Sequence, residues 1–168
     1  MIASAMRAAL GFVALLGMTG SSGADAPKAP KLTTATTAIY PSKSCKEQES
    51  ALVGAVPRFV CRGLGGFEVD VYVSTDDIRM VITKSDYDPP VRVDAIKISK
   101  LEWRLADGKP FAVIAEVTVK DQQTKKLSKV FMVRGLARER VSKEIAGTEE
   151  GAHDVALALA DELASSSH

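Results

Sequence analysis

The sequence predicts an α+β fold, in which an antiparallel β-meander sheet carries one C-terminal amphipathic helix packed on one face. Apolar and polar residues alternate over several short stretches, which is typical of strands with one face in water. Turn residues separate these stretches, including Gly63–Gly66 and the Asp107-Gly108 pair of a tight hairpin. Only near the C-terminus do apolar residues recur at helical spacing, and one helix after a run of hairpins is typical of α+β domains.

The N-terminus precedes this fold and has the features of a secretory signal peptide. Arg7 is its only charge, an apolar run covers residues 8–18, and small polar residues follow. We therefore expect residues 1–24 to be a signal peptide cleaved after Ala24, with cleavage after Ala26 as the alternative. The apolar run is about half of the ~20 residues of a membrane-spanning helix, so no stable membrane insertion is expected after cleavage. The predicted location is periplasmic or secreted.

The mature chain begins with a stretch that has little to bury. Residues 25–37 consist mostly of Pro, Ala, Lys and Thr, so we expect a flexible linker. A single domain then spans residues 38–168.

Within the domain, alternation predicts the strands in order. Residues 84–90 should form a loop, because consecutive prolines cannot donate hydrogen bonds to a sheet. Trp103 shares a face with Leu101 and Leu105 and is expected in the core, with Glu102 and Arg104 on the opposite face. The expected strands are 58–62, 67–73 and 78–83 as a meander, a short strand at 96–98, and then 101–105, 111–119, 127–134 and 138–145.

The C-terminal helix is expected to begin at Thr148. The Thr148 hydroxyl can cap the helix, and Glu149 and Glu150 would interact favourably with its dipole in the first turn. The apolar stripe that should face the sheet consists of Ala152, Val155, Ala156, Leu159, Ala160 and Leu163.

Cys45 and Cys61 are the only cysteines, and in an exported chain an even number of cysteines predicts a disulfide. Two free thiols are the alternative. A structural zinc site is disfavoured, because His153 and His168 are the only histidines. We expect no metal and no cofactor.

Catalytic patterns are weak, and we expect a protein that is not an enzyme. The glycines at 63–66 lack the lysine and hydroxyl of a nucleotide-binding loop, and a strand follows them, so a turn is the better interpretation. Glu68 and Asp70 lie two apart on one strand face and are the candidate carboxylates of a hydrolase, an arrangement also common on solvated strands. His153 is the third candidate for such an activity.

Charge is balanced overall and uneven locally. Lys and Arg number 22 against 21 Asp and Glu, so no global basic field attracts nucleic acid. Residues 120–145 carry an excess of five basic groups and residues 146–164 an excess of five acidic groups. Ordinary solvated faces that satisfy one another are one interpretation. The other is a basic surface for an anionic partner, a protein or a wall polymer, formed by Lys125, Lys126, Arg134, Arg138 and Arg140.

Three short motifs carry a resemblance to known proteins. They are Phe59–Gly66 (FVCRGLGG), Glu102–Leu105 (EWRL) and Gly108–Phe111 (GKPF). With these motifs the chain resembles small exported proteins of alphaproteobacteria over about residues 38–163. The resemblance implies a periplasmic location and no particular activity. We therefore predict a non-catalytic binding protein, and the alternatives are an inhibitor of a cell-wall hydrolase, by analogy of size, compartment and disulfide, or a hydrolase.

Overall fold

The computed structural model describes residues 28–49, 55–84, 87–136 and 142–165. The predicted signal peptide, both candidate cleavage sites, Arg138 and Arg140 lie outside these residues. The elements are β1 (Leu32–Thr37), β2 (Cys45–Gln48), β3 (Arg58–Arg62), β4 (Glu68–Val73), β5 (Ile78–Lys84), β6 (Tyr87–Ala95), β7 (Lys97–Ala106), β8 (Lys109–Lys120), β9 (Leu127–Gly135), β10 (Ser142–Ala146) and α1 (Ala152–Ser165).

The strands form two antiparallel five-stranded sheets, so the predicted α+β fold is confirmed, with two sheets in place of one. Sheet A has the order β1-β7-β8-β9-β10, and sheet B has the order β2-β3-β4-β5-β6. The predicted meander is β3-β4-β5 of sheet B. The Asp107-Gly108 turn joins β7 to β8, and both of its residues have positive φ angles, as a tight hairpin requires.

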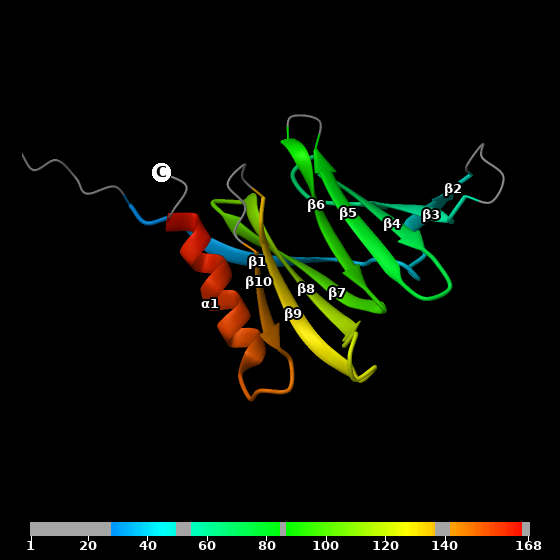
Figure 1. Cartoon of the computed structure of the whole chain (residues 1–168). Coiled ribbons are helices and arrows are strands. Elements are labelled where there is room, and N and C mark those ends of the chain that lie inside the picture. Colours follow the sequence, from blue (N-terminus) through cyan, green and yellow to red (C-terminus); the bar gives the residue numbers. More distant parts are fainter. Residues whose placement is uncertain (1–27, 50–54, 85–86, 137–141, 166–168) are drawn as a thin grey trace, which may run out of the picture.

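Three layers result, with sheet A in the middle (Figure 1). A core that includes Trp103, Val71 and Met80 fills the space between the two sheets. A second core, which includes Ile114 and Val133, lies between sheet A and α1. Among the described residues, sheet A is therefore covered on both faces, whereas sheet B is covered on one.

The helix begins later than predicted, and most of the predicted stripe, namely Ala152, Ala156, Ala160 and Leu163, packs against the sheet as expected. Residues 148–151 form turns, and Gly151, with a φ of 75°, precedes the first helical residue, so Thr148 does not cap the helix. Ala152, Ala156 and Ala160 are buried against sheet A, where their small side chains let the helix approach closely. Val155 was predicted in this stripe but is 49% exposed, because the face that packs on the sheet is centred on the three alanines, and Leu157 contacts the core on its other flank.

The expected linker at residues 25–37 is wrong for its second half. Leu32–Thr37 form β1, which pairs with β7 at the margin of sheet A. The Trp103 Nε1 donates a hydrogen bond of 2.7 Å to the Thr37 hydroxyl, and this satisfies the polar atom of a fully buried indole. Pairing with β7 therefore makes this segment a strand, although its sequence lacks the alternation of apolar and polar residues seen in other strands.

The expected loop at 84–90 is also shorter than predicted. Tyr87–Pro90 belong to β6, which pairs with β5 on one side only. An edge strand can contain proline, because the missing N–H need not face a neighbouring strand.

The glycine-rich turn at 63–66 links β3 to β4 within sheet B and packs against residues of sheet A. A Cβ on Gly63 would lie 2.5 Å from the Phe67 carbonyl oxygen, and one on Gly65 would lie 2.6 Å from the Pro110 ring. The Phe67 ring lies 5.7 Å from the Trp103 ring. The three motifs of the predicted resemblance therefore meet in space as packing residues, and the turn interpretation of the glycines is confirmed.

Candidate functional site

The outer face of sheet B is the broad surface that no described element covers. Strand register places a set of alternating side chains on it, which we call the open face. In Figure 1 this face points away from sheet A and α1. The open face consists of Lys46 and Gln48 from β2, Arg58, Val60 and Arg62 from β3, Glu68, Asp70 and Tyr72 from β4, Arg79, Val81 and Thr83 from β5, and Arg92 and Asp94 from β6.

A disulfide between Cys45 and Cys61 anchors the edge of this sheet, as predicted. The two residues lie directly opposite each other on β2 and β3, with 4.2 Å between their Cα atoms. Cys61 is fully buried in the core between the sheets. The covalent bond therefore holds the four-residue strand β2, and with it Lys46, against the rest of sheet B.

Glu68 and Asp70, the candidate hydrolase carboxylates, share one arginine. Arg58 donates to the Asp70 Oδ1 from Nε at 2.9 Å and from Nη2 at 2.7 Å, and its Nη2 lies 3.6 Å from the Glu68 Oε1. The hydrogen bond that Arg58 donates to Asp70 raises the pKa of the Arg58 guanidinium, which burial alone would lower. Asp70 is buried, and Arg58 stands between the two carboxylates where a hydrolase would place substrate. The geometry is that of an ion-paired cluster.

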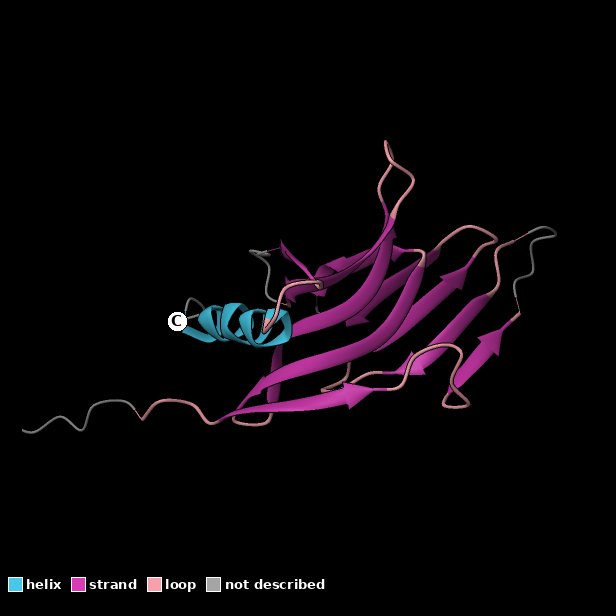
Figure 2. Ribbon diagram, turned by 90° about the horizontal axis from the view of Figure 1, so that it is seen from below, coloured by secondary structure: helices cyan, strands magenta, loops and turns pink. Residues whose placement is uncertain are grey.

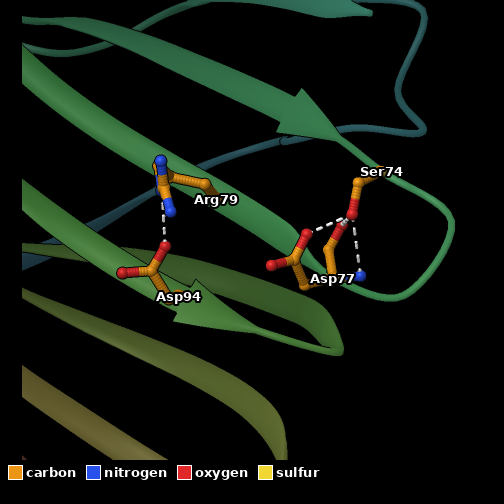
Figure 3. Close-up of polar contacts among 4 residues, drawn as sticks. All are labelled: Ser74, Asp77, Arg79 and Asp94. Atoms are coloured by element: carbon orange, nitrogen blue, oxygen red, sulfur yellow. Dashed lines mark hydrogen bonds and ion pairs between the residues drawn. The ribbon is translucent and has the colours of Figure 1, made fainter. Parts of the chain in front are cut away.

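A second ion pair lies at the far side of the open face (Figure 3). The Arg79 Nε donates to the Asp94 Oδ1 at 2.7 Å, from β5 to the neighbouring β6. This hydrogen bond raises the pKa of Arg79. Nearby, the Ser74 hydroxyl bonds to the Asp77 carboxylate and closes the turn between β4 and β5. These contacts pair the carboxylates of Asp77 and Asp94 with neighbouring side chains of the protein.

Three cations of the open face have no acidic partner among the described residues. Lys46, Arg62 and Arg92 are all exposed and form no ion pair with any described side chain. Lys46 and Arg62 line a hollow of about 470 Å³, together with Ser44, Val60 and Glu68 and the turn that begins at Gly63. The open face thus combines fixed ion pairs with cations that are available to a partner.

Charged contacts between β7 and α1 were not predicted from the sequence. Arg104 from β7 forms a two-pronged pair with Asp161 of α1, with Nε–Oδ1 at 2.8 Å and Nη2–Oδ2 at 2.7 Å, and also bonds to the Thr34 hydroxyl. Both Glu102 and Arg104 are buried. Two sequence features could have predicted the pairing of Arg104 with Asp161: the acidic character of the helix, and the charged residues on one face of β7.

His153, the third candidate for catalysis, contacts Glu102. Its Nε2 lies 3.0 Å from the Glu102 Oε1, and Lys100 contacts the same carboxylate. Burial raises the pKa of Glu102, but the hydrogen bonds from Lys100 and His153 outweigh it, and the pKa lies below its ordinary value. His153 therefore attaches α1 to sheet A. It lies on α1, at the opposite face of sheet A from sheet B, so the structure does not bring it together with Glu68 or Asp70.

The predicted basic surface is not one patch in the described part of the chain. Lys125 and Lys126 lie in the exposed turn between β8 and β9, where Asp121 accepts hydrogen bonds from the Gln123 and Thr124 backbone. Arg134 lies near the other end of β9, where it contacts Glu144 of β10 at 3.4 Å. At about 3.3 Å per strand residue, Lys126 and Arg134 are roughly 25 Å apart.

Neither a metal cluster nor a membrane helix is found in the described ranges. Within residues 28–49, 55–84, 87–136 and 142–165, no three His, Cys, Asp or Glu side chains are grouped to hold a metal ion. Within the same ranges no helix is long and apolar enough to cross a membrane.

Comparison with known proteins returns no match from protein-family models, from curated proteins or from solved structures.

Proposed function

We propose that the protein is an exported, non-catalytic binding protein that holds an anionic partner on the open face of sheet B. The observation that supports this is the set of three exposed cations, Lys46, Arg62 and Arg92, on a sheet face whose other charges are ion-paired. A partner that supplies carboxylates or phosphates would complete these pairs.

The spacing of the cations favours an extended partner. Lys46, Val60, Asp70, Val81 and Arg92 follow one another across the five strands. With neighbouring strands ~4.8 Å apart, Lys46 and Arg92 are separated by about 19 Å. A wall polymer or an acidic protein segment can reach both ends of such a row, whereas a small anion contacts one end.

The rigidity of the face supports binding over catalysis. Its charged side chains are held by Arg58–Asp70 and Arg79–Asp94, and its edge is held by the disulfide. The backbone and the paired side chains are thus ordered before contact, so that mainly the three cations without an acidic partner among the described residues lose side-chain entropy on binding. Glu68 and Asp70 would be the catalytic carboxylates if the protein were a hydrolase. Both contact Arg58, which favours a structural role for them.

Co-sedimentation with purified peptidoglycan tests the polymer form of this proposal. The protein is expected to pellet with the polymer at low salt and to be released at high salt, because exposed ion pairs are screened. The double variant Lys46→Glu/Arg62→Glu should lose this binding. The matched control Lys125→Glu/Lys126→Glu makes the same change in charge at the β8–β9 turn and should bind like the parent protein.

The outcome of these variants discriminates between the two basic surfaces. Loss of binding in the Lys125→Glu/Lys126→Glu variant alone would contradict the open face as the site and would favour the turn. If neither peptidoglycan nor any protein of a periplasmic extract binds at low salt, the proposed function is wrong. A captured wall hydrolase that loses activity in the complex would support the inhibitor alternative for the same surface.

A further inference from the structure

The four edge strands of the two sheets differ in how they are protected against pairing with another chain. Natural edges carry charges or proline, which discourage a second strand from docking. Of the described edge residues, β2 contains Lys46 and Glu47, β10 contains Lys143 and Glu144, and β6 contains two prolines. β1 has neither, since its sequence is LTTATT. β1 is therefore the unprotected edge of the described structure.

The hydrogen bonds at the start of β1 determine which backbone groups face outward. The Asp107 N–H donates to the Lys31 carbonyl oxygen at 3.0 Å, so Lys31 and Asp107 form a hydrogen-bonded pair of the antiparallel ladder. Such pairs alternate along the strand, so Thr33, Ala35 and Thr37 turn their backbone groups toward β7. The N–H and C=O groups of Leu32, Thr34 and Thr36 consequently point away from sheet A.

The exposed side chains of β1 also favour contact with another protein chain. Leu32 is a large apolar residue with 37% of its surface exposed, and Thr36, on the same face near the other end of the strand, is also exposed. An apolar hollow of about 280 Å³, lined by Pro30, Ala106 and Phe111 among others, lies at the beginning of the strand. In Figure 2, β1 continues from the N-terminal segment and runs along the lower margin of the molecule.

We infer that β1 pairs antiparallel with β1 of a second copy of this chain, around a two-fold axis at Thr34. In that register Thr34 faces Thr34 of the other copy, and Leu32 faces Thr36. No charge lies between residues 32 and 37, so no like charges meet across the axis. The outward backbone groups of each copy find partners in the other, and the two A sheets become one continuous sheet. Such a contact is closed and self-complementary, as a two-fold dimer requires.

This inference does not depend on the proposed function, because the pairing uses sheet A and leaves the open face of sheet B uncovered. A dimer would present two open faces to one polymer, which raises the apparent affinity through multivalency.

Sedimentation equilibrium of the purified protein, from micromolar to millimolar concentrations, tests the inference. The parent protein is expected to form a dimer. The variant Leu32→Lys/Thr36→Lys places lysine opposite lysine at both ends of the paired segment and should be monomeric throughout. Ser142→Lys, on the exposed β10 edge of the same sheet, is the matched control and should remain a dimer.

A second variant separates loss of pairing from loss of folding. Thr36→Pro removes an outward N–H and leaves the hydrogen bonds to β7 in place. At about 1 kcal/mol for each hydrogen bond lost on the two sides of the axis, the dissociation constant should rise roughly tenfold or more. The melting temperature at low concentration should match that of the parent protein. A parent protein that stays monomeric, or a Leu32→Lys/Thr36→Lys variant that still forms dimers, would overturn the inference.

Discussion

The two sheets differ in how many of their faces are buried. In β8 of sheet A the run Ala112–Ala115 is wholly buried, because one face meets α1 and the other meets sheet B. In β4 of sheet B, Val69 and Val71 are buried while Glu68 is exposed. Sheet A, which packs against a layer on each side, has apolar residues on both faces of β8. Sheet B, which packs on one side, has a polar outer face. An uncovered polar face is where a partner can bind without disturbing the core.

The charged residues of the two sheets differ in the same way. On the helix-facing side of sheet A, Glu102 and Arg104 are buried, and each contacts a residue of α1. Removing one partner would leave a buried charge without compensation, which is costly. On the open face of sheet B Asp70 is buried beneath Arg58, but the Arg79–Asp94 pair lies in water, where an ion pair contributes little to stability. Sheet A therefore uses charge to attach its helix, whereas sheet B carries charged side chains that no described element covers.

Removal of the disulfide should have the largest effect and should act on sheet B. The bridge closes a loop with a sequence separation of 16, and its loss costs about 3 kcal/mol in the chain-entropy account. Urea unfolding of the Cys45→Ala/Cys61→Ala variant measures this change. Hydrogen exchange should show faster opening of β2 and β3, with β7 and β8 little affected. Equal loss of protection in both sheets would mean that they unfold as one unit.

A matched pair of valine substitutions compares the helix-facing side of sheet A with the open face of sheet B. Val133→Ala removes two methyl groups from the interface with α1 and should lower the free energy of unfolding by about 2 kcal/mol. Val81→Ala, on the half-buried open face, should cost less than about 1 kcal/mol. Thermal or urea unfolding gives both values. Similar costs at the two positions would imply that something covers the open face.

The attachment of the helix should weaken in acid, which is the smallest of the three effects. The pKa of Glu102 is lowered in the folded protein, because the hydrogen bonds from Lys100 and His153 outweigh the effect of burial. Its contribution to stability is therefore present above the ordinary pKa of about 4.5 and is lost as the pH falls through the lower folded value. Chemical unfolding at several pH values measures the slope, which should be shallower in Glu102→Gln.

Local sequence signals predicted the parts of the fold that depend on neighbours along the chain. The alternation in β4 and β5, the Asp107-Gly108 hairpin and the burial of Trp103 were all predicted and are confirmed. The disulfide was predicted from two cysteines in a chain that is expected to be exported, and the structure pairs them. Each of these features can be recognised within a short window or from a simple count.

Features that depend on distant segments were missed or misplaced. Leu32–Thr37 have a linker-like composition and become a strand because β7 offers an edge at that place. Val155 has the correct spacing for a core residue, yet α1 docks through its alanine face and leaves Val155 exposed. Asp161 and Arg104 lie far apart in sequence and meet only when the helix docks.

The amino-acid order thus specified strands, turns, one helix and the pairing of two cysteines, because those choices follow from backbone preferences and from side-chain periodicity. The stacking of layers specified which sheet is covered twice, which charges are buried and which edge and face stay open. Those outcomes depend on contacts between segments that no local pattern encodes, since a strand's alternation is the same whether its polar face meets water or a neighbouring layer.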